Sequence, residues 1–319
     1  MKAKTDAPVI LFFGTPEFAV PSLEALHQEF GIRAVVTGPD KPQGRGLRRQ
    51  PPPVKVAAQR LGIDLILQPV RLKDPDFQRR LAALQPDIIV VIAFRILPPS
   101  VYTLARKGAF NVHPSLLPAY RGAAPIHWVI IRGEKQTGVT SFLLQETVDT
   151  GPIVLQKAVP IPERCTAGEL HDLLAPLAAE IAVETTRLLL EGRAQPRPQP
   201  PGEYPTAPKL RPEDCWIRWD RPAEEVCQWI RGLSPIPGAR TLWDGKLLKI
   251  LQCDPVTNEQ HLSPAQFFID SHTFVVGCGN HTAIAIAELQ LQGKKRLRVE
   301  DFLRGYRGQQ SGQFDAPAG

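Results

Sequence analysis

The chain contains little cysteine, and its cysteines do not have the spacing of a metal site. It has five, an odd number, and the nearest two, Cys215 and Cys227, stand 12 positions apart. Neither Cys-x-x-Cys nor His-Glu-x-x-His occurs. These absences argue against a zinc site and against a disulfide framework, so we expect reduced thiols and no bound metal. The five are Cys165, Cys215, Cys227, Cys253 and Cys278.

Long apolar runs are also missing. The segment Ile88–Phe94 is among the longest, and it is far shorter than the roughly 18 residues that a membrane helix needs. Residues 1–8 include Asp6 and no apolar core, so we expect no signal or transit peptide, no membrane partner and a cytoplasmic setting. Gly14-Thr15-Pro16 follows an apolar strand without a Gly-x-Gly-x-x-Gly motif, which excludes a nicotinamide cofactor by that signature.

The size and charge of the chain bound its partners. A length of 319 residues exceeds a usual single core, so two domains are expected. Thirty-eight Lys and Arg against 32 Asp and Glu give a formal net charge of +6. This charge favours an anionic partner without identifying it.

The first 190 residues alternate short apolar runs with helical periodicity. Ala19, Leu23, Leu26 and Phe30 form one helical stripe, and residues 167–191 predict a long closing helix. The alternation predicts a doubly wound, Rossmann-like α/β domain over residues 1–191. The predicted strands are Val9–Phe13, Ala34–Thr37, Leu65–Leu67, Ile88–Ile92, Ala109–Val112 and Val139–Leu144.

A proline-rich stretch separates this domain from a second one. Seven prolines between Gln195 and Pro212 predict a semi-rigid extended linker over residues 192–212. Residues 213–319 then carry short β-type segments and one helix, Cys227–Leu233, which favours a small β-barrel. Barrels of this kind often bind nucleic acid, and a purely structural barrel fits the pattern equally well. The predicted strands are Trp216–Trp219, Leu247–Gln252, Phe267–Ile269, Thr273–Val276 and Thr282–Gln292.

Three polar residues form the candidate catalytic group. Asn111 and His113 are two positions apart at the end of an apolar run, so they project from one face of a strand. The prolines that follow end the strand, which places both at a carboxyl edge, where open α/β sheets bind ligands. Asn111 and a protonated or donating His113 could stabilise the oxyanion of an acyl or formyl transfer. Asp149 would set the His113 tautomer and raise its pKa, or accept a proton through water. Asp before Thr-Gly is also a common turn former, and that alternative stays open.

Two basic stretches distinguish candidate acceptors. Between Lys41 and Ile63 there are six basic residues and no acidic one, and the glycines and prolines there predict a mobile loop. A charge run is usually a solvated face. One-signed charge on a mobile loop also suits the phosphates of an RNA end. The second stretch, set against Glu300 and Asp301, consists of Lys294, Lys295, Arg296, Arg298, Arg304 and Arg307.

The string at residues 111–128, NVHPSLLPAYRGAAPIHW, closely resembles the signature of the folate-dependent formyltransferases. The resemblance implies that Asn111, His113 and Asp149 are the catalytic trio. The strings at residues 12–19, 39–46 and 231–239, which read FFGTPEFA, PDKPQGRG and RGLSPIPGA, resemble the members that formylate initiator methionyl-tRNA. The likeness therefore runs from about residue 8 to past residue 300.

The resemblance implies a donor, an acceptor and their binding residues. The implied donor is 10-formyltetrahydrofolate, the implied acceptor is initiator methionyl-tRNA, and the second domain is implied to be an OB-like, tRNA-binding barrel. We expect a monomer. Arg95 departs from the pattern, in which glycine is frequent, as do Pro114 and Arg240. The implied folate-binding residues are Phe94, Arg95, Ile96, Leu97, Ser115, Leu116, Leu117 and Pro118. The two basic stretches supply the expected tRNA-binding residues, which are Lys41, Arg45, Arg48, Arg49, Lys294, Lys295 and Arg296.

Two other functions remain open at this point. One is transfer from the same donor to the amine of a small nucleotide or sugar nucleotide. The other is an RNA-binding module whose α/β domain is catalytically silent. The basic stretches on both domains argue against the first, and the intact trio argues against the second.

Overall fold

The computed structural model describes residues 7–43 and 48–315. The chain forms two compact units, and each unit is assembled from three separate segments of the sequence. Unit 1 comprises Met1–Gly122, Gln136–Pro160 and His171–Thr206. Unit 2 comprises Ala123–Lys135, Ile161–Leu170 and Ala207–Gly319. Two short segments that precede residue 171 therefore pack with the C-terminal region, and the linear division at residues 191 and 212 stays a prediction.

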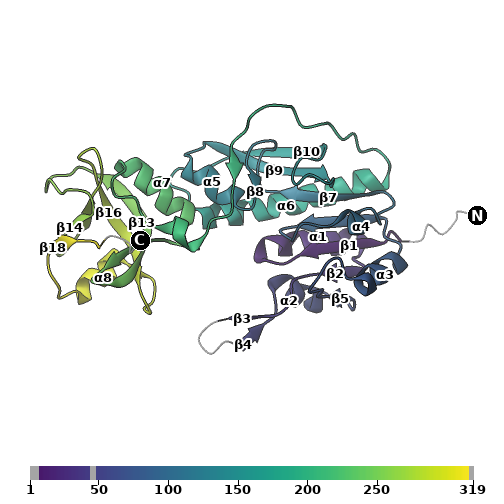
Figure 1. Ribbon diagram of the computed structural model, residues 1–319, viewed down its shortest axis with the longest axis horizontal. Helices are drawn as coiled ribbons and strands as arrows, with labels where there is room; N and C mark the ends of the chain where they lie inside the picture. The colour runs from purple at the N-terminus through teal and green to yellow at the C-terminus, as the bar shows by residue number, and fades with distance from the viewer. Residues whose placement is uncertain (1–6, 44–47, 316–319) are drawn as a thin grey trace, which may run out of the picture. The chain divides into compact units, whose positions relative to one another are not determined.

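Unit 1 is built on a seven-stranded sheet (Figure 1). Its strands are β1 (Ile10–Gly14), β2 (Ala34–Val36), β5 (Ile66–Leu67), β6 (Ile88–Ile92), β7 (Gly108–His113), β9 (Gln136–Leu143) and β10 (Ile153–Pro160). Their spatial order is β10-β9-β7-β6-β1-β2-β5. The five strands from β5 to β7 are parallel, whereas β9 and β10 run antiparallel to their neighbours. The unit is an α/β domain of the predicted class.

Helices cover both faces of this sheet, because the strand residues that point to either face are apolar. Leu11 and Phe13 pack in one core cluster with Phe77, Leu81 and Val101 of the helices, while Ile10 and Phe12 are fully buried on the other face. Three of these helices begin with a proline, Pro53, Pro75 or Pro99, which suits the first turn. The helices are η1 (Glu17–Ala19), α1 (Val20–Phe30), α2 (Pro53–Arg60), α3 (Pro75–Ala83), α4 (Pro99–Tyr102) and α6 (Ala167–Leu190).

The strand order reverses between β1 and β6. From β1 the chain proceeds to β2 and β5 on one side, and β6 and β7 continue on the other. Gly14 pairs with Ile92, so the carboxyl ends of β1 and β6 meet at one edge. Open α/β sheets bind ligands at such a switch point. The residues that follow β6 and β7 belong to the same edge.

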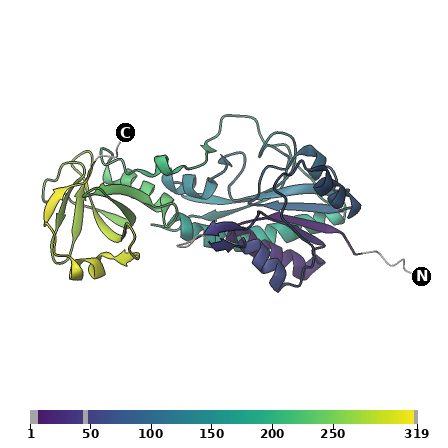
Figure 2. The ribbon, with the colours of Figure 1, turned by 60° about the horizontal axis from the view of Figure 1, so that its bottom comes forward.

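Unit 2 contains a curled antiparallel sheet (Figure 2). Its strands are β12 (Ala239–Trp243), β13 (Lys246–Val256), β14 (Gln266–Ile269), β15 (Phe274–Gly277), β16 (Ala283–Leu291), β17 (Leu297–Arg298) and β18 (Ser311–Gln313). They follow the order β12-β13-β16-β15-β14-β18, with β17 beside β16. A bridge between Leu242 of β12 and Asp315, just after β18, joins the two edges. This closure is consistent with the predicted OB-like barrel.

The barrel core is aromatic. Trp243 lies with its ring centroid 5.4 Å from that of Phe267 and 5.5 Å from that of Phe274. Helix α7 (Ala223–Leu233) contributes Val226 and Ile230 to the same core. Unit 2 also contains α5 (Pro125–Ile131), η2 (Pro212–Cys215) and α8 (Val299–Gly305).

Several elements differ from their predictions. Most predicted strands lie within a few residues of their observed bounds, and β6 has the predicted ones. Several observed strands were not predicted, β10 and β12 among them. β10 is an edge strand with exposed polar residues such as Gln156 and Lys157, so it lacks an apolar pattern. β12 is five residues long and carries Arg240. Trp216–Trp219, predicted as a strand, forms only the single bridge between Trp216 and Arg240.

The remaining short elements are β3 (Lys41–Gln43), β4 (Arg48–Gln50), β8 (Arg121–Gly122) and β11 (Thr206–Ala207). All five cysteines are free and buried. No helix formed by residues 7–43 and 48–315 has the length and apolar character to span a membrane.

Candidate active site

Asn111 and His113 lie at the carboxyl end of β7, a strand that is paired between β6 and β9. The His113 ring is buried, with 5% of the residue exposed. The Asn111 Oδ1 atom is also buried and has no hydrogen-bond partner among the described residues. Buried polar atoms are normally paired. The Asn111 side chain therefore keeps unused hydrogen-bonding capacity at the carboxyl edge of the sheet.

The His113 imidazole is oriented by a backbone carbonyl. Its Nε2 atom lies 2.9 Å from the oxygen of Tyr120. Because a carbonyl oxygen only accepts, Nε2 carries the hydrogen, and the neutral ring presents an unprotonated Nδ1. The expectation that Asp149 fixes this tautomer is wrong, because the Tyr120 carbonyl makes the bond that fixes it.

Burial sets the charge state of His113. Removal of the ring from water lowers the pKa of His113 below its ordinary value of 6.5. The negative charge of Asp149 and the bond to Tyr120 raise this pKa, but by less. The prediction that Asp149 raises the pKa of His113 is right for that contribution, and burial outweighs it. A neutral His113 at pH 7 can accept a proton on Nδ1.

Asp149 is held in a tertiary contact. Its Oδ2 atom accepts a hydrogen bond from the backbone N–H of Gly122 over 3.0 Å. Its backbone has φ = 56°, in the left-handed region that non-glycine residues rarely adopt. The turn itself is closed by Thr150, whose hydroxyl donates to the oxygen of Thr147. The Asp149 carboxylate therefore makes a contact outside its own turn, while its left-handed backbone is one that a turn-forming Asp also adopts.

The residues implied for folate binding divide into two segments. The first follows β6: Phe94 packs edge-on against Phe13, with ring centroids 5.5 Å apart, and Leu97 is buried in the core. Ile96 is 71% exposed. Arg95 donates to the carbonyl oxygens of Pro69 and Val70, so its guanidinium ties two loops together. In this segment the exposed Ile96 side chain, the half-buried Phe94 ring and the backbone are open to a ligand.

The second segment follows β7. Ser115 is fully buried, and its hydroxyl donates to the oxygen of Ala119 over 2.8 Å. The N–H of Leu117 donates to Thr140 Oγ1, and the carbonyl oxygen of Leu117 accepts from Gln156. Leu116 and Pro118 are partly exposed. The loop is thus fixed against β9 and β10, and the side chains of Ser115 and Leu117 point into protein.

The basic stretch after β2 is partly ordered into a hairpin. β3 and β4 pair antiparallel, with Lys41 opposite Gln50 and Pro42 opposite Arg49, so the prediction of a loop is wrong for these residues. Lys41 and Arg49 are exposed. Arg45 lies outside the described residues, and nothing is described for the Arg48 side chain.

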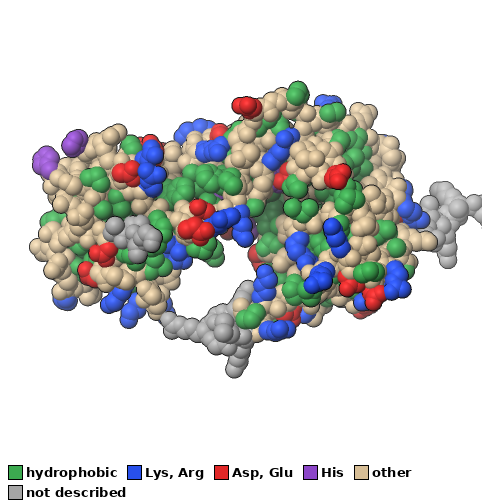
Figure 3. All heavy atoms as spheres, viewed as in Figure 1, with side chains coloured by type: hydrophobic (Ala, Val, Ile, Leu, Met, Phe, Trp, Pro, Cys, Tyr) green, Lys and Arg blue, Asp and Glu red, His purple; other side chains and the backbone are tan. Residues whose placement is uncertain are grey.

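Several other cations are engaged in ion pairs. Lys55 binds Asp40 over 2.8 Å, and Arg296 binds both carboxylate oxygens of Glu288. Lys294 and Lys295 are exposed. Figure 3 shows Lys and Arg side chains dispersed over the visible face, several beside Asp or Glu. The cations open to a polyanion are therefore fewer than the sequence suggests.

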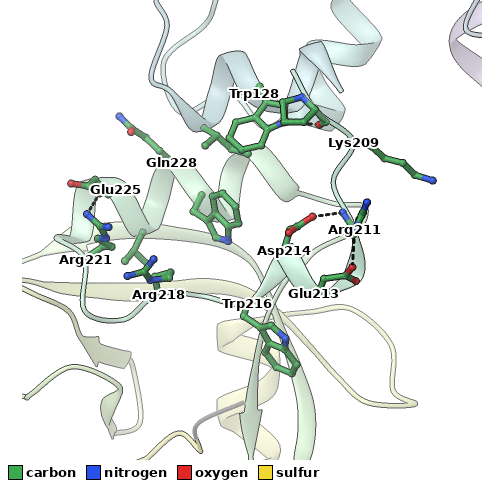
Figure 4. Close-up of a pocket in the computed structure, with 14 residues that line it drawn as sticks. Trp128, Lys209, Arg211, Glu213, Asp214, Trp216, Arg218, Arg221, Glu225 and Gln228 are labelled. Carbon is green, nitrogen blue, oxygen red and sulfur yellow. Dashed lines mark hydrogen bonds and ion pairs between the residues drawn. The ribbon is translucent and has the colours of Figure 1, made fainter. Parts of the chain in front are cut away.

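A hollow of about 780 Å³ lies in unit 2 between α5, α7 and the segment around η2. Trp128, Trp216 and Trp229 form much of its wall (Figure 4). Its charges are largely compensated within the rim, since Arg221 pairs with Glu225, and Lys209 extends away from it. None of the sequence-predicted site residues lines this hollow.

Three residues that the sequence did not predict hold His113 and Asp149 in place. Tyr120, with φ = 62°, supplies the carbonyl for His113, and Gly122 supplies the N–H for Asp149. Gln199, in the proline-rich stretch, donates to the carbonyl oxygens of Asp149 and Gly151. The first two act through backbone atoms, which leave no signal in residue type.

Comparison with known proteins adds to this geometry. The family profile described as Formyl transferase matches residues 8–186, and that described as Formyl transferase, C-terminal domain matches residues 209–307. The chain belongs to the formyl transferase family. A relative from Pelotomaculum thermopropionicum, named Methionyl-tRNA formyltransferase, is 49% identical over 300 residues, covering 93% of this chain and 95% of its own. A relative of the same name from Chlorobium limicola is 44% identical, covering 93% and 96%.

Solved structures share the fold of this formyltransferase. An N-formyltransferase from Helicobacter canadensis, in complex with folinic acid and dTDP-3-aminofucose, has a TM-score of 0.64 at 17% identity, covering 88% of this chain and 98% of its own. A methionyl-tRNA formyltransferase from Clostridium thermocellum has a TM-score of 0.55 at 18% identity, covering 77% and 93%. At such identities the likeness concerns the fold.

Proposed function

We propose that the enzyme transfers the formyl group of 10-formyltetrahydrofolate to the amino group of initiator methionyl-tRNA. The observation that carries the proposal is the 49% identity, over nearly the full length of both chains, to a relative named Methionyl-tRNA formyltransferase. The geometry of Asn111, His113 and Asp149 supports the chemistry. The second domain and the exposed basic hairpin support a polyanionic acceptor rather than a small one.

The donor fits the carboxyl edge of the sheet at β6 and β7. The partnerless Oδ1 atom of Asn111 and the exposed side chain of Ile96 both belong to this edge. The fixed loop at residues 115–118 would supply backbone groups, and Phe94 an aromatic wall. Because Ser115 and Leu117 are buried, their part in folate binding would be limited to the backbone.

Formyl transfer needs one group that carries a proton and one hydrogen-bond donor that stabilises the oxyanion. The neutral amine of the methionyl group attacks the formyl carbon, a C–N bond forms, and the carbonyl oxygen becomes an oxyanion. The Asn111 amide donates to that oxygen. His113 Nδ1 takes a proton from the attacking nitrogen, and Asp149 stabilises the imidazolium. The same proton then passes to the folate nitrogen as its bond to the formyl carbon breaks.

One assay tests the proposal directly. Purified enzyme is given 10-formyltetrahydrofolate with charged initiator methionyl-tRNA, and with glycinamide ribonucleotide as the control acceptor. We expect rapid formylation of the tRNA and at most trace formylation of the nucleotide. Preference for the nucleotide would instead establish the small-acceptor alternative.

The pKa of His113 is a testable consequence of its burial. We expect an NMR titration of the folded enzyme to give a His113 pKa below 6.5, because burial outweighs the two raising effects. In Asp149→Asn the pKa should fall further, since the carboxylate that favours the imidazolium is gone. A His113 pKa above 6.5, or one that rises in the variant, would contradict the charge assignment.

The exposed arginine of β4 should act on tRNA rather than on folate. We expect Arg49→Ala to raise the KM for tRNA several-fold at low salt, and the difference from the parent should shrink as salt rises. The KM for 10-formyltetrahydrofolate should not change. Arg79→Ala, which removes an exposed, ion-paired arginine from α3, is the matched control. Equal tRNA kinetics for Arg49→Ala and parent across the salt series would remove the hairpin from the tRNA site.

A further inference from the structure

The proline-rich segment after α6 returns to the surroundings of the trio. The backbones of Arg197 and Ile153 exchange two hydrogen bonds, of 2.8 Å and 2.7 Å. Farther along, the carbonyl oxygen of Pro205 accepts from the N–H of Tyr120 over 2.6 Å. Gln199, between these two anchors, is partly buried. The segment therefore lies fixed along unit 1 rather than serving only as a connector.

Gln199 uses its whole amide in this position. Nε2 donates to the carbonyl oxygens of Asp149 and Gly151, each over 2.9 Å. Oε1 accepts from the guanidinium of Arg121, with Nε at 3.1 Å. Carbonyl oxygens only accept and arginine only donates, so the orientation of the amide is fixed by its partners. Both hydrogens of Nε2 are directed at the loop that carries Asp149.

This loop needs an external constraint. Asp149 has φ = 56°, and sparsely populated conformations persist only where the surroundings hold them. Gly151 lies against the end of β9 so closely that an added Cβ would lie 1.7 Å from the oxygen of Leu143. Gln199 bridges the carbonyls on either side of Thr150. It therefore fixes the backbone from which the Asp149 carboxylate projects.

The contacts form a closed ring. The Asp149 carboxylate accepts from Gly122, Arg121 precedes Gly122 and binds Gln199, and Gln199 returns to the Asp149 carbonyl. Tyr120, which precedes Arg121, holds His113. The same short segment thus connects the groups that orient both ionisable members of the trio.

We propose that Gln199 is a positioning residue for formyl transfer, which acts by holding Asp149 in its working orientation. The proposal rests on the proposed function, because it requires the Asp149 carboxylate to take part in the reaction. Gln199 itself need not touch either substrate. Its loss should therefore lower kcat while the KM values for folate and tRNA stay nearly constant.

The full-length enzyme with Gln199→Glu separates the two halves of the amide. Glutamate still accepts from Arg121 but cannot donate to the two carbonyls. We expect kcat to fall roughly tenfold to a hundredfold, the scale of a small misplacement of a reacting group. Gln199→Met, neutral and of similar length, should show a comparable fall and answers the question if the glutamate variant does not fold. Gln195, exposed in the same segment, provides the matched controls Gln195→Glu and Gln195→Met, which should match the parent.

A double-mutant cycle distinguishes positioning from a general structural role. If Gln199 acts through Asp149, adding Gln199→Met to Asp149→Asn should lower kcat little further. An undiminished effect in that background would overturn the proposal, as would a parent-like kcat for Gln199→Met beside an impaired Asp149→Asn. Should Asp149→Asn itself be fully active, the role of Asp149 in the proposed function fails first. Thermal midpoints of all variants should be measured, so that unfolding can be excluded as the cause of a lower kcat.

Discussion

Asp149→Asn should lower kcat for formyl transfer by roughly 10²-fold or more. Asparagine preserves the shape of the side chain and its tolerance of the left-handed backbone, which Asp149 adopts with φ = 56°. Its side-chain oxygen can still accept from Gly122. What it lacks is the negative charge that favours the His113 imidazolium. The loss is therefore expected in the chemical step rather than in folate binding.

A surface pair provides the control for this variant. Asp172 lies 2.9 Å from His171 Nδ1 on α6, and its side chain is 83% exposed. Asp172→Asn thus removes the same charge beside the same residue type, outside the proposed site, and should leave kcat unchanged. Single-turnover kinetics and thermal midpoints should be measured for both variants. A folded Asp149→Asn enzyme with most of its activity would reduce Asp149 to a turn residue.

The sequence predicted those parts of the site that depend on periodicity and chain order. Short continuous apolar runs predicted β6 and β7, and the two-residue spacing placed Asn111 and His113 on one face. The prolines after His113 predicted the strand end. Such apolar runs form the central strands because both faces of the sheet are buried.

Long-range backbone contacts could not be predicted in this way. Tyr120 orients His113 through a carbonyl that every residue possesses, and its φ of 62° is atypical for tyrosine. Gln199 stands in a run whose prolines indicate only an extended chain. Its partners lie 48 to 78 positions away. No local pattern carries information over such separations.

The same limit applies to the division into units. α5 comes from the first half of the chain, yet His127 contacts the Gly232 carbonyl of α7 over 2.7 Å, and Gly232 leaves no room for a Cβ against Ile131. A chain ending near Glu191 would contain the whole trio. It would lack α7, Gln199 and Pro205, so the presence of the trio in a fragment does not make its geometry independent of the rest.

His113→Asn should cost at least as much as Asp149→Asn, a fall in kcat of roughly 10²-fold or more. Asparagine retains a polar group but has no titrating nitrogen, so it cannot carry the proton from the attacking amine to the leaving folate nitrogen. His113 is proposed to move the proton and not to bind the donor, so its replacement should not weaken folate binding. The KM for the donor should stay within about twofold of the parent value.

The double variant His113→Asn/Asp149→Asn gives the sharper result. Asp149 is proposed to act only by stabilising the His113 imidazolium, so without the imidazole its charge has nothing to stabilise. We therefore expect the double variant to be little slower than His113→Asn alone, because groups that act as a unit are non-additive. If the two losses multiply, Asp149 acts on the substrates independently of His113, and the proton path through Nδ1 must be replaced by one that begins at the carboxylate.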